Sequence, residues 1–79
     1  MDNLKTLISL WKWCVLVAEH YSKVVMTEDD FDALINSVSK NRDKYDKKKY
    51  GKFYDTTTNL LLDAISKDQR EKVRNLENK

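Results

Sequence analysis

The sequence predicts an all-α protein: a small helical bundle of three long helices and a short C-terminal fourth, with consecutive helices as antiparallel neighbours. The 79 residues include no proline and one glycine, whereas an all-β chain of this length would need many more turn residues. Apolar residues also recur at helical spacing along most of the chain. We expect a single domain over residues 1–79, with one modest core.

The first helix is predicted over residues 3–25. Two apolar stripes run along it, one made of Leu4, Ile8, Trp11, Val15, Ala18 and Val25, the other of Leu7, Leu10, Cys14, Val17, Tyr21 and Val24. Together they form an apolar arc of roughly 200° around the helix. Because one neighbouring helix cannot cover so wide an arc, we expect this helix at the centre of the bundle, packed on two sides.

A second helix is predicted to begin at Thr27. A threonine can accept a hydrogen bond from a free N–H of the first turn, and the next three residues are acidic, which suits a helix N-terminus. The apolar face consists of Phe31, Leu34, Ile35, Val38 and Tyr45. The pattern continues to Lys49, and Gly51 is the expected terminator.

Another helix start is predicted at Asp55, because an aspartate followed by three threonines is typical of a first turn. Its buried face would be formed by Leu60, Leu61, Ala64 and Ile65. Ser66 and Gln69 have the spacing of a capping box, and Val73 and Leu76 follow on one face. Residues 66–77 therefore form either a separate fourth helix or an extension of the third.

The single cysteine and the short apolar run near the N-terminus predict a cytoplasmic protein. The net charge is +2, but residues 1–39 carry −3 and residues 40–79 carry +5. Cys14 is the only cysteine, so an internal disulfide is impossible and a reducing compartment is expected. The apolar run 7–18 is interrupted by Lys12 and is too short to cross a bilayer, so no membrane association is expected.

No catalytic residue, metal ligand or cofactor site is predicted, and we expect no enzyme activity. The only histidine, His20, lies six residues from Cys14 on one helix, so the two side chains point about 120° apart and cannot act as a pair. A single glycine cannot build a phosphate-binding loop. Four carboxylates lie close together but lack the spacing of a calcium loop, and they suit a helix cap: Glu28, Asp29, Asp30 and Asp32.

The leading interpretation is a protein-binding module that acts as an inhibitor, adaptor or regulator. Trp13, Leu16 and His20 form one stripe on the polar side of the first helix, where an exposed tryptophan is typical of a docking site. The partner would be another protein, or a second copy in a homodimer. A second contact is predicted at Glu28, Asp29 and Asp32. The alternative is that the last helix covers Trp13.

A nucleic-acid-binding protein is the alternative function. The stretch KNRDKYDKKKYGKFYD, residues 40–55, carries seven of the fifteen basic residues. Its candidate contacts are Lys44, Lys47, Lys48, Lys49, Tyr50, Lys52 and Tyr54, with lysines on phosphates and tyrosines stacked on bases. Three aspartates in the same stretch and a pI of about 8.7 count against this function. The simpler interpretation is a solvated helix end.

Overall fold

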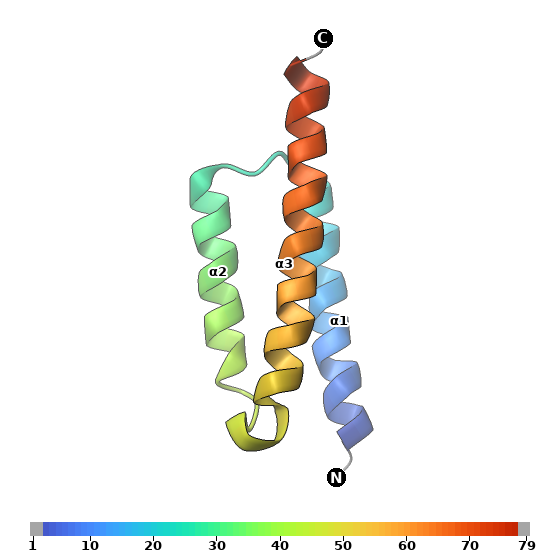
Figure 1. Ribbon diagram of the computed structural model, residues 1–79, viewed down its shortest axis with the longest axis vertical. Coiled ribbons are helices and arrows are strands. Elements are labelled where there is room, and N and C mark those ends of the chain that lie inside the picture. The colour runs from blue at the N-terminus through green and yellow to red at the C-terminus, as the bar shows by residue number, and fades with distance from the viewer. Residues whose placement is uncertain (1–2, 78–79) are drawn as a thin grey trace.

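The computed structural model describes residues 3–77, which form three helices joined by two short connections (Figure 1). Helix α1 spans Asn3–Ser22, α2 spans Glu28–Arg42 and α3 spans Lys47–Glu77. No strand occurs within residues 3–77, so the predicted all-α class is confirmed for this part of the chain. The first two and last two residues of the predicted domain lie outside the described residues.

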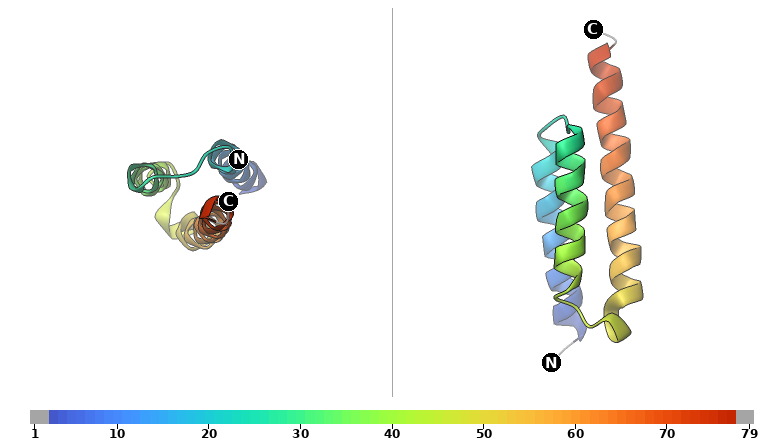
Figure 2. Two further views of the ribbon diagram at one scale, coloured as in Figure 1. Left: turned by 90° about the horizontal axis from the view of Figure 1, so that it is seen from above. Right: turned by 90° about the vertical axis from the view of Figure 1, so that its left-hand side faces the viewer.

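The helices form an elongated bundle measuring 52 × 20 × 17 Å. In Figure 1 the chain runs up α1, down α2 and up again along α3, so α3 is parallel to α1. With 31 residues α3 is about 46 Å long, and with 20 residues α1 is about 30 Å long. The C-terminal end of α3 therefore projects beyond the other two helices (Figure 2).

The central helix of the bundle is α3. Its backbone approaches both α1 and α2, whereas no Cα atom of α1 lies within 8 Å of a Cα atom of α2. The view along the bundle in Figure 2 shows the three helices at the corners of a triangle. The central position predicted for the first helix is therefore taken by α3. Only α3 covers α1 closely, and part of the wide apolar arc of α1 stays open.

The start of α2 follows the predicted local chemistry. Thr27 is the N-cap, and its Oγ1 accepts a hydrogen bond from the backbone N–H of Asp30 at 3.2 Å. The Asp30 carboxylate accepts in return from the Thr27 N–H at 2.9 Å. This reciprocal capping box satisfies two backbone donors that the helix itself cannot use.

The junction between α2 and α3 differs from the prediction. Helix α2 ends at Arg42 instead of continuing to Lys49, and a turn of four residues follows. Asp46 then caps the start of α3, because its Oδ1 accepts from the backbone N–H of Lys48 at 2.8 Å and of Lys49 at 3.3 Å. The structure places the cap on an aspartate that the sequence pattern had assigned to the interior of a helix.

Gly51 and Asp55 lie inside α3, so neither ends nor begins a helix. A Cβ atom at Gly51 would lie 3.6 Å from the guanidinium of Arg42, and the glycine is buried beneath that side chain. Arg42 forms a two-pronged ion pair with Asp55, with N···O distances of 2.9 and 3.0 Å. The ion pair between Arg42 and Asp55 therefore joins α2 to α3, and Gly51 leaves space for the Arg42 side chain.

The predicted fourth helix is absent from residues 3–77, since α3 runs unbroken from Lys47 to Glu77. Ser66 and Gln69 are interior residues of α3, and their spacing does not mark a helix start. Val73 and Leu76 lie near its projecting end and are 42% and 57% exposed. They do not fold back over Trp13, so the alternative that the last helix covers this residue is also wrong.

The apolar core is small. Within the described residues the buried apolar side chains are Leu10, Leu34, Tyr54 and Ile65. The Tyr54 hydroxyl donates to the backbone carbonyl of Val38, which satisfies its polar end inside the bundle. Eleven large apolar side chains are exposed in the same part of the chain, so burial within one copy is incomplete.

Candidate functional site

An exposed apolar stripe runs along α1. Ile8, Trp11 and Val15 are 46%, 52% and 54% exposed, although the sequence pattern placed them in the buried arc. Their spacing of three and four residues keeps them within about 60° around the helix. With Lys12 and Leu16 they line a shallow groove. The prediction of burial fails on this side because α3 is the one helix whose backbone comes close to α1.

Helix α3 extends this surface. The Phe53 ring is half-buried, with its centroid 6.3 Å from that of Trp11 at an interplanar angle of 57°. Leu60 follows two turns later on the same side of α3 and is 68% exposed. We call the combined surface the outer face; it consists of Ile8, Trp11, Val15 and Leu16 of α1, and Phe53 and Leu60 of α3.

Charged residues follow the edge of the Ile8, Trp11 and Val15 stripe that lies away from α3. Lys5, Lys12 and Glu19 are exposed and occur every seven residues, so they lie along one line of α1. No ion pair joins Lys5 or Glu19 to another residue in the described chain. The N-terminal part of this edge is therefore basic, and its C-terminal end is acidic.

The predicted protein-binding stripe lies beside the outer face and overlaps it at one residue. Leu16 is 64% exposed and His20 is exposed, with its ring 4.8 Å edge-on from the Tyr21 ring. Trp13 is half-buried, on the side of α1 away from Phe53. Trp11 is thus the more exposed of the two tryptophans, and sequence reasoning chose the other. The excess width of the apolar arc was the signal that could have identified Trp11.

The acidic turn remains separate from this surface. Glu28, Asp29 and Asp32 are exposed on the first turns of α2, and α2 keeps its backbone away from α1. Glu28 and Asp29 lie in the first turn, where the helix dipole favours negative charge. The structure does not bring these carboxylates onto the outer face.

The basic segment, residues 40–55, spans the end of α2, the turn after it and the first turns of α3. Its lysines are exposed: Lys44, Lys47, Lys48, Lys49 and Lys52. Tyr50 is half-buried, and its hydroxyl donates to Asn3 Oδ1 at 2.7 Å. Tyr54 is 1% exposed, so its ring cannot stack on a base as predicted. Burial raises the pKa of the Tyr54 hydroxyl.

A polar hollow lies between this segment and the start of α1. It is lined by Asn3, Lys5, Thr6, Ser9, Lys44, Tyr45, Asp46, Lys49 and Tyr50. Three of these residues are lysines, but the Asp46 carboxylate already accepts the nearby backbone N–H groups of α3. This hollow gathers positive charge without offering the free helix N-terminus that anion sites use.

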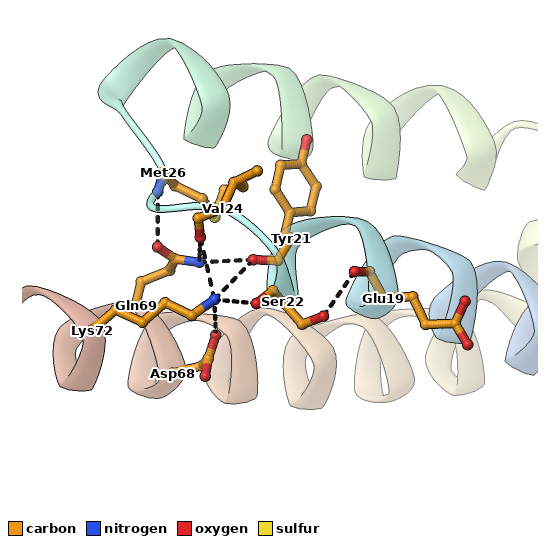
Figure 3. Close-up of polar contacts among 8 residues, drawn as sticks. All are labelled: Glu19, Tyr21, Ser22, Val24, Met26, Asp68, Gln69 and Lys72. Atoms are coloured by element: carbon orange, nitrogen blue, oxygen red, sulfur yellow. Dashed lines mark hydrogen bonds and ion pairs between the residues drawn. The ribbon is translucent and has the colours of Figure 1, made fainter.

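A polar clamp, defined as Gln69 and Lys72 of α3, fastens the C-terminal end of α1 (Figure 3). Gln69 is 4% exposed; its amide nitrogen donates to the carbonyls of Tyr21 and Val24 at 3.0 Å each. Its amide oxygen accepts from the Met26 N–H at 2.8 Å. The side chain therefore satisfies backbone groups at the end of α1 and in the connection to α2.

The Lys72 ammonium completes the clamp. It donates to the carbonyl of Ser22 at 2.6 Å and to those of Tyr21 and Val24 at 3.2 Å. It also pairs with Asp68 at 2.9 Å. A cation at this position complements the negative end of the α1 dipole. Sequence reasoning missed the clamp because its partners are backbone atoms about 50 residues away.

Groups suited to catalysis are scattered. Burial raises the pKa of the half-buried Cys14 thiol, which disfavours the reactive thiolate. Among residues 3–77, no group of three or more His, Cys, Asp or Glu side chains is placed to hold a metal ion.

Comparison of the chain with protein-family models, with curated proteins and with solved structures finds no match. None of the described helices combines the length and the apolar character needed to cross a membrane.

Proposed function

We propose that this protein is a non-enzymatic helical module of the cytoplasm that works by binding another polypeptide, as an inhibitor, adaptor or regulator. The observation that carries the proposal is the outer face, where Trp11, Val15 and Leu60 leave much apolar surface in water. Contiguous apolar surface around an aromatic residue, beside charged side chains, is typical of protein interfaces.

The small core supports the same function. A chain of 79 residues buries a limited share of its apolar surface by itself, and association with a partner buries more. The outer face is also spread along two parallel helices, so a partner can bury it without unfolding the bundle. Leu16 would contribute to the contact, and His20 would lie at its margin.

Nucleic-acid binding is the second candidate, favoured by the polar hollow and its three lysines. Lys44, Lys47, Lys48, Lys49 and Lys52 are exposed and free to reach phosphates. This function would depend on charge alone, because Tyr54 is buried and Tyr50 bonds to Asn3. Its affinity would fall steeply with salt concentration.

Two immobilised variants separate the functions when exposed to nuclease-treated lysate. Val15→Glu places a charge on the outer face; Leu76→Glu places the same charge on the projecting end of α3, at a similarly exposed leucine. We expect defined proteins to bind the wild type and Leu76→Glu, and to be lost from Val15→Glu. Equal capture by all three baits, or loss of all capture after nuclease, would contradict the proposed function. If proteins are captured from untreated lysate but none remain after nuclease treatment, the protein binds nucleic acid. Reversal of Lys47, Lys48 and Lys49 to glutamate should then abolish capture from the untreated lysate.

A further inference from the structure

We propose that the occupant of the outer face is a second copy of this chain, related by a twofold axis that runs between Trp11 and Lys12 and makes the two α1 helices antiparallel. This inference rests on the proposed function, because it identifies the polypeptide that binds the outer face as another copy of the same chain. It follows from three properties of the outer face: the spacing of its apolar residues, the order of the charges along its edge, and its area.

The apolar spacing favours a helix as the occupant. Ile8, Trp11 and Val15 are separated by three and then four residues, and Ala18 continues the series. This is the a/d repeat of a helix that packs along another helix. The stripe is narrow, since it covers about 60° of α1, and a second helix of similar width would fill it. The remaining edge is occupied by Phe53 and Leu60 of α3.

The charge order selects the direction. Lys5, Lys12 and Glu19 occupy equivalent positions of three successive heptads, next to the apolar stripe. In two parallel copies related by a twofold axis, the charged edge of each helix would face the other edge of its partner, so these three charges would not meet. In antiparallel copies the same edge of each helix meets, so each Lys5 lies opposite the partner's Glu19 and each Glu19 opposite the partner's Lys5.

Within one chain these two side chains cannot pair, because fourteen residues of helix separate them by about 21 Å. The complementary charges therefore act only between copies. The same register places Ile8 opposite the partner's Val15 and brings the two Trp11 rings near the axis. Each polypeptide then supplies α1 and α3 to a four-helix contact.

The area allows a weak, reversible dimer. From Lys5 to Glu19 the surface is about 21 Å long and, at two helices wide, has a footprint of about 400 Å² on each copy. This is about half of the roughly 800 Å² per partner of a standard specific interface, which suits a dimer that dissociates on dilution. The twofold symmetry requires that the same patch serve both copies, which the charge order of α1 satisfies.

Sedimentation equilibrium of the purified full chain, at concentrations up to about 1 mM, tests the proposal. We expect a reversible monomer–dimer equilibrium for the wild type and for Leu76→Glu. Val15→Glu should weaken the dimer by about 100-fold or more, because each copy buries an unpaired carboxylate opposite Ile8. Circular dichroism checks that the helices survive; Val15 is half exposed, so the substitution leaves the monomer folded.

Charge reversal tests the direction and the register. Lys5→Glu and Glu19→Lys should each weaken the dimer roughly tenfold by creating two like-charge contacts, and the double variant should regain wild-type affinity. A wild type that stays monomeric overturns the proposal, and so does a dimer that Val15→Glu leaves intact. Failure of the double variant to recover overturns the antiparallel register.

The proposed function is judged separately. If the wild type is monomeric but Val15→Glu still loses proteins captured from lysate, the outer face binds a different protein and only the second copy is excluded. If no variant differs in either experiment, both proposals are wrong. Binding of the wild type to anionic lipid vesicles, lost in Val15→Glu without any dimer, would also exclude the second copy.

Discussion

The two ends of the contact between α1 and α3 are completed by different chemistry. At the C-terminal end of α1, the clamp residues Gln69 and Lys72 satisfy backbone carbonyls within the same chain. Along the outer face, Trp11 and Phe53 meet at 6.3 Å, and half of the Trp11 surface stays in water. One region is closed within a single copy, and the other is left incomplete.

The difference separates folding from association. The groups bound by the clamp are backbone donors and acceptors that must be satisfied whenever the chain is folded, so their contribution does not depend on concentration. The outer face gains by burial only when a second polypeptide arrives. Substitutions in the clamp should therefore change the free energy of unfolding of the monomer, and substitutions in the outer face should change the dissociation constant.

The largest expected effect within the clamp is that of Gln69→Ala. The substitution removes three hydrogen bonds and leaves the Met26 N–H without its protein partner, so the free energy of unfolding should fall by about 2 kcal/mol. For a domain of this size the melting temperature should fall by about 8–16 °C. The effect is measured in the Val15→Glu background, which prevents dimer formation. The melting temperature of Val15→Glu is compared with that of the double variant Val15→Glu, Gln69→Ala. An unchanged melting temperature would mean that the clamp is dispensable.

Lys72→Met should have a smaller effect. Methionine keeps the apolar stem of the lysine but loses the ammonium that caps α1 and pairs with Asp68. The expected loss is about 1 kcal/mol, because a partly buried cation at a helix C-terminus contributes about that much. Urea unfolding measures it, and the exposed Lys67 of the same helix, changed to methionine, provides the control. Equal effects at both positions would contradict a specific role for Lys72.

Alkaline pH should weaken the interior and spare the apolar contacts of the outer face. Burial raises the pKa of Tyr54 above its ordinary value of 10.0, so the folded chain holds this proton more tightly than the unfolded chain. The resulting stability is fully present below pH 10 and is lost as the pH rises through the folded-state pKa. Urea unfolding between pH 9 and 11, compared with Tyr54→Phe, isolates this loss. A wild type whose decline matches that of the variant would refute it.

The smallest expected effect concerns Lys12. In the antiparallel dimer the two Lys12 ammoniums lie on the same edge near the twofold axis, where they repel each other at the rim. Lys12→Gln should tighten the dimer about two- to threefold, since exposed charge pairs contribute a fraction of 1 kcal/mol. Sedimentation at low salt measures the change. A weaker dimer would indicate that Lys12 lies elsewhere in the interface.

Local sequence chemistry predicted part of the fold, and tertiary contacts decided the rest. Thr27 caps α2 as expected, because the backbone N–H that its side chain accepts from belongs to Asp30, three residues away. Gly51 and Asp55 carried equally local signals for a helix end and a helix start, yet both are interior to α3. There Gly51 leaves room for Arg42 of α2, and Asp55 binds the Arg42 guanidinium. A local sequence pattern does not reveal a contact between two helices.

The candidate site shows the same limit. The width of the apolar arc on α1 predicted burial on two sides, but only α3 brings its backbone close to α1, and part of the arc stays exposed. Trp13 was chosen over Trp11 because helical spacing alone does not reveal on which side α3 packs. The clamp could not be predicted at all, since Gln69 binds backbone carbonyls rather than recognisable side chains.

The most direct test of the outer face as an interface is the fluorescence of Trp11 alone, in the Trp13→Phe variant, followed over a dilution series from about 1 mM to 1 µM. Trp11 is half in water in the single chain and becomes buried when a second copy covers it. We expect a blue-shifted emission at high concentration that moves to the red on dilution, and a red emission throughout when Val15→Glu is added. An emission maximum that stays constant across the dilution series would contradict this expectation.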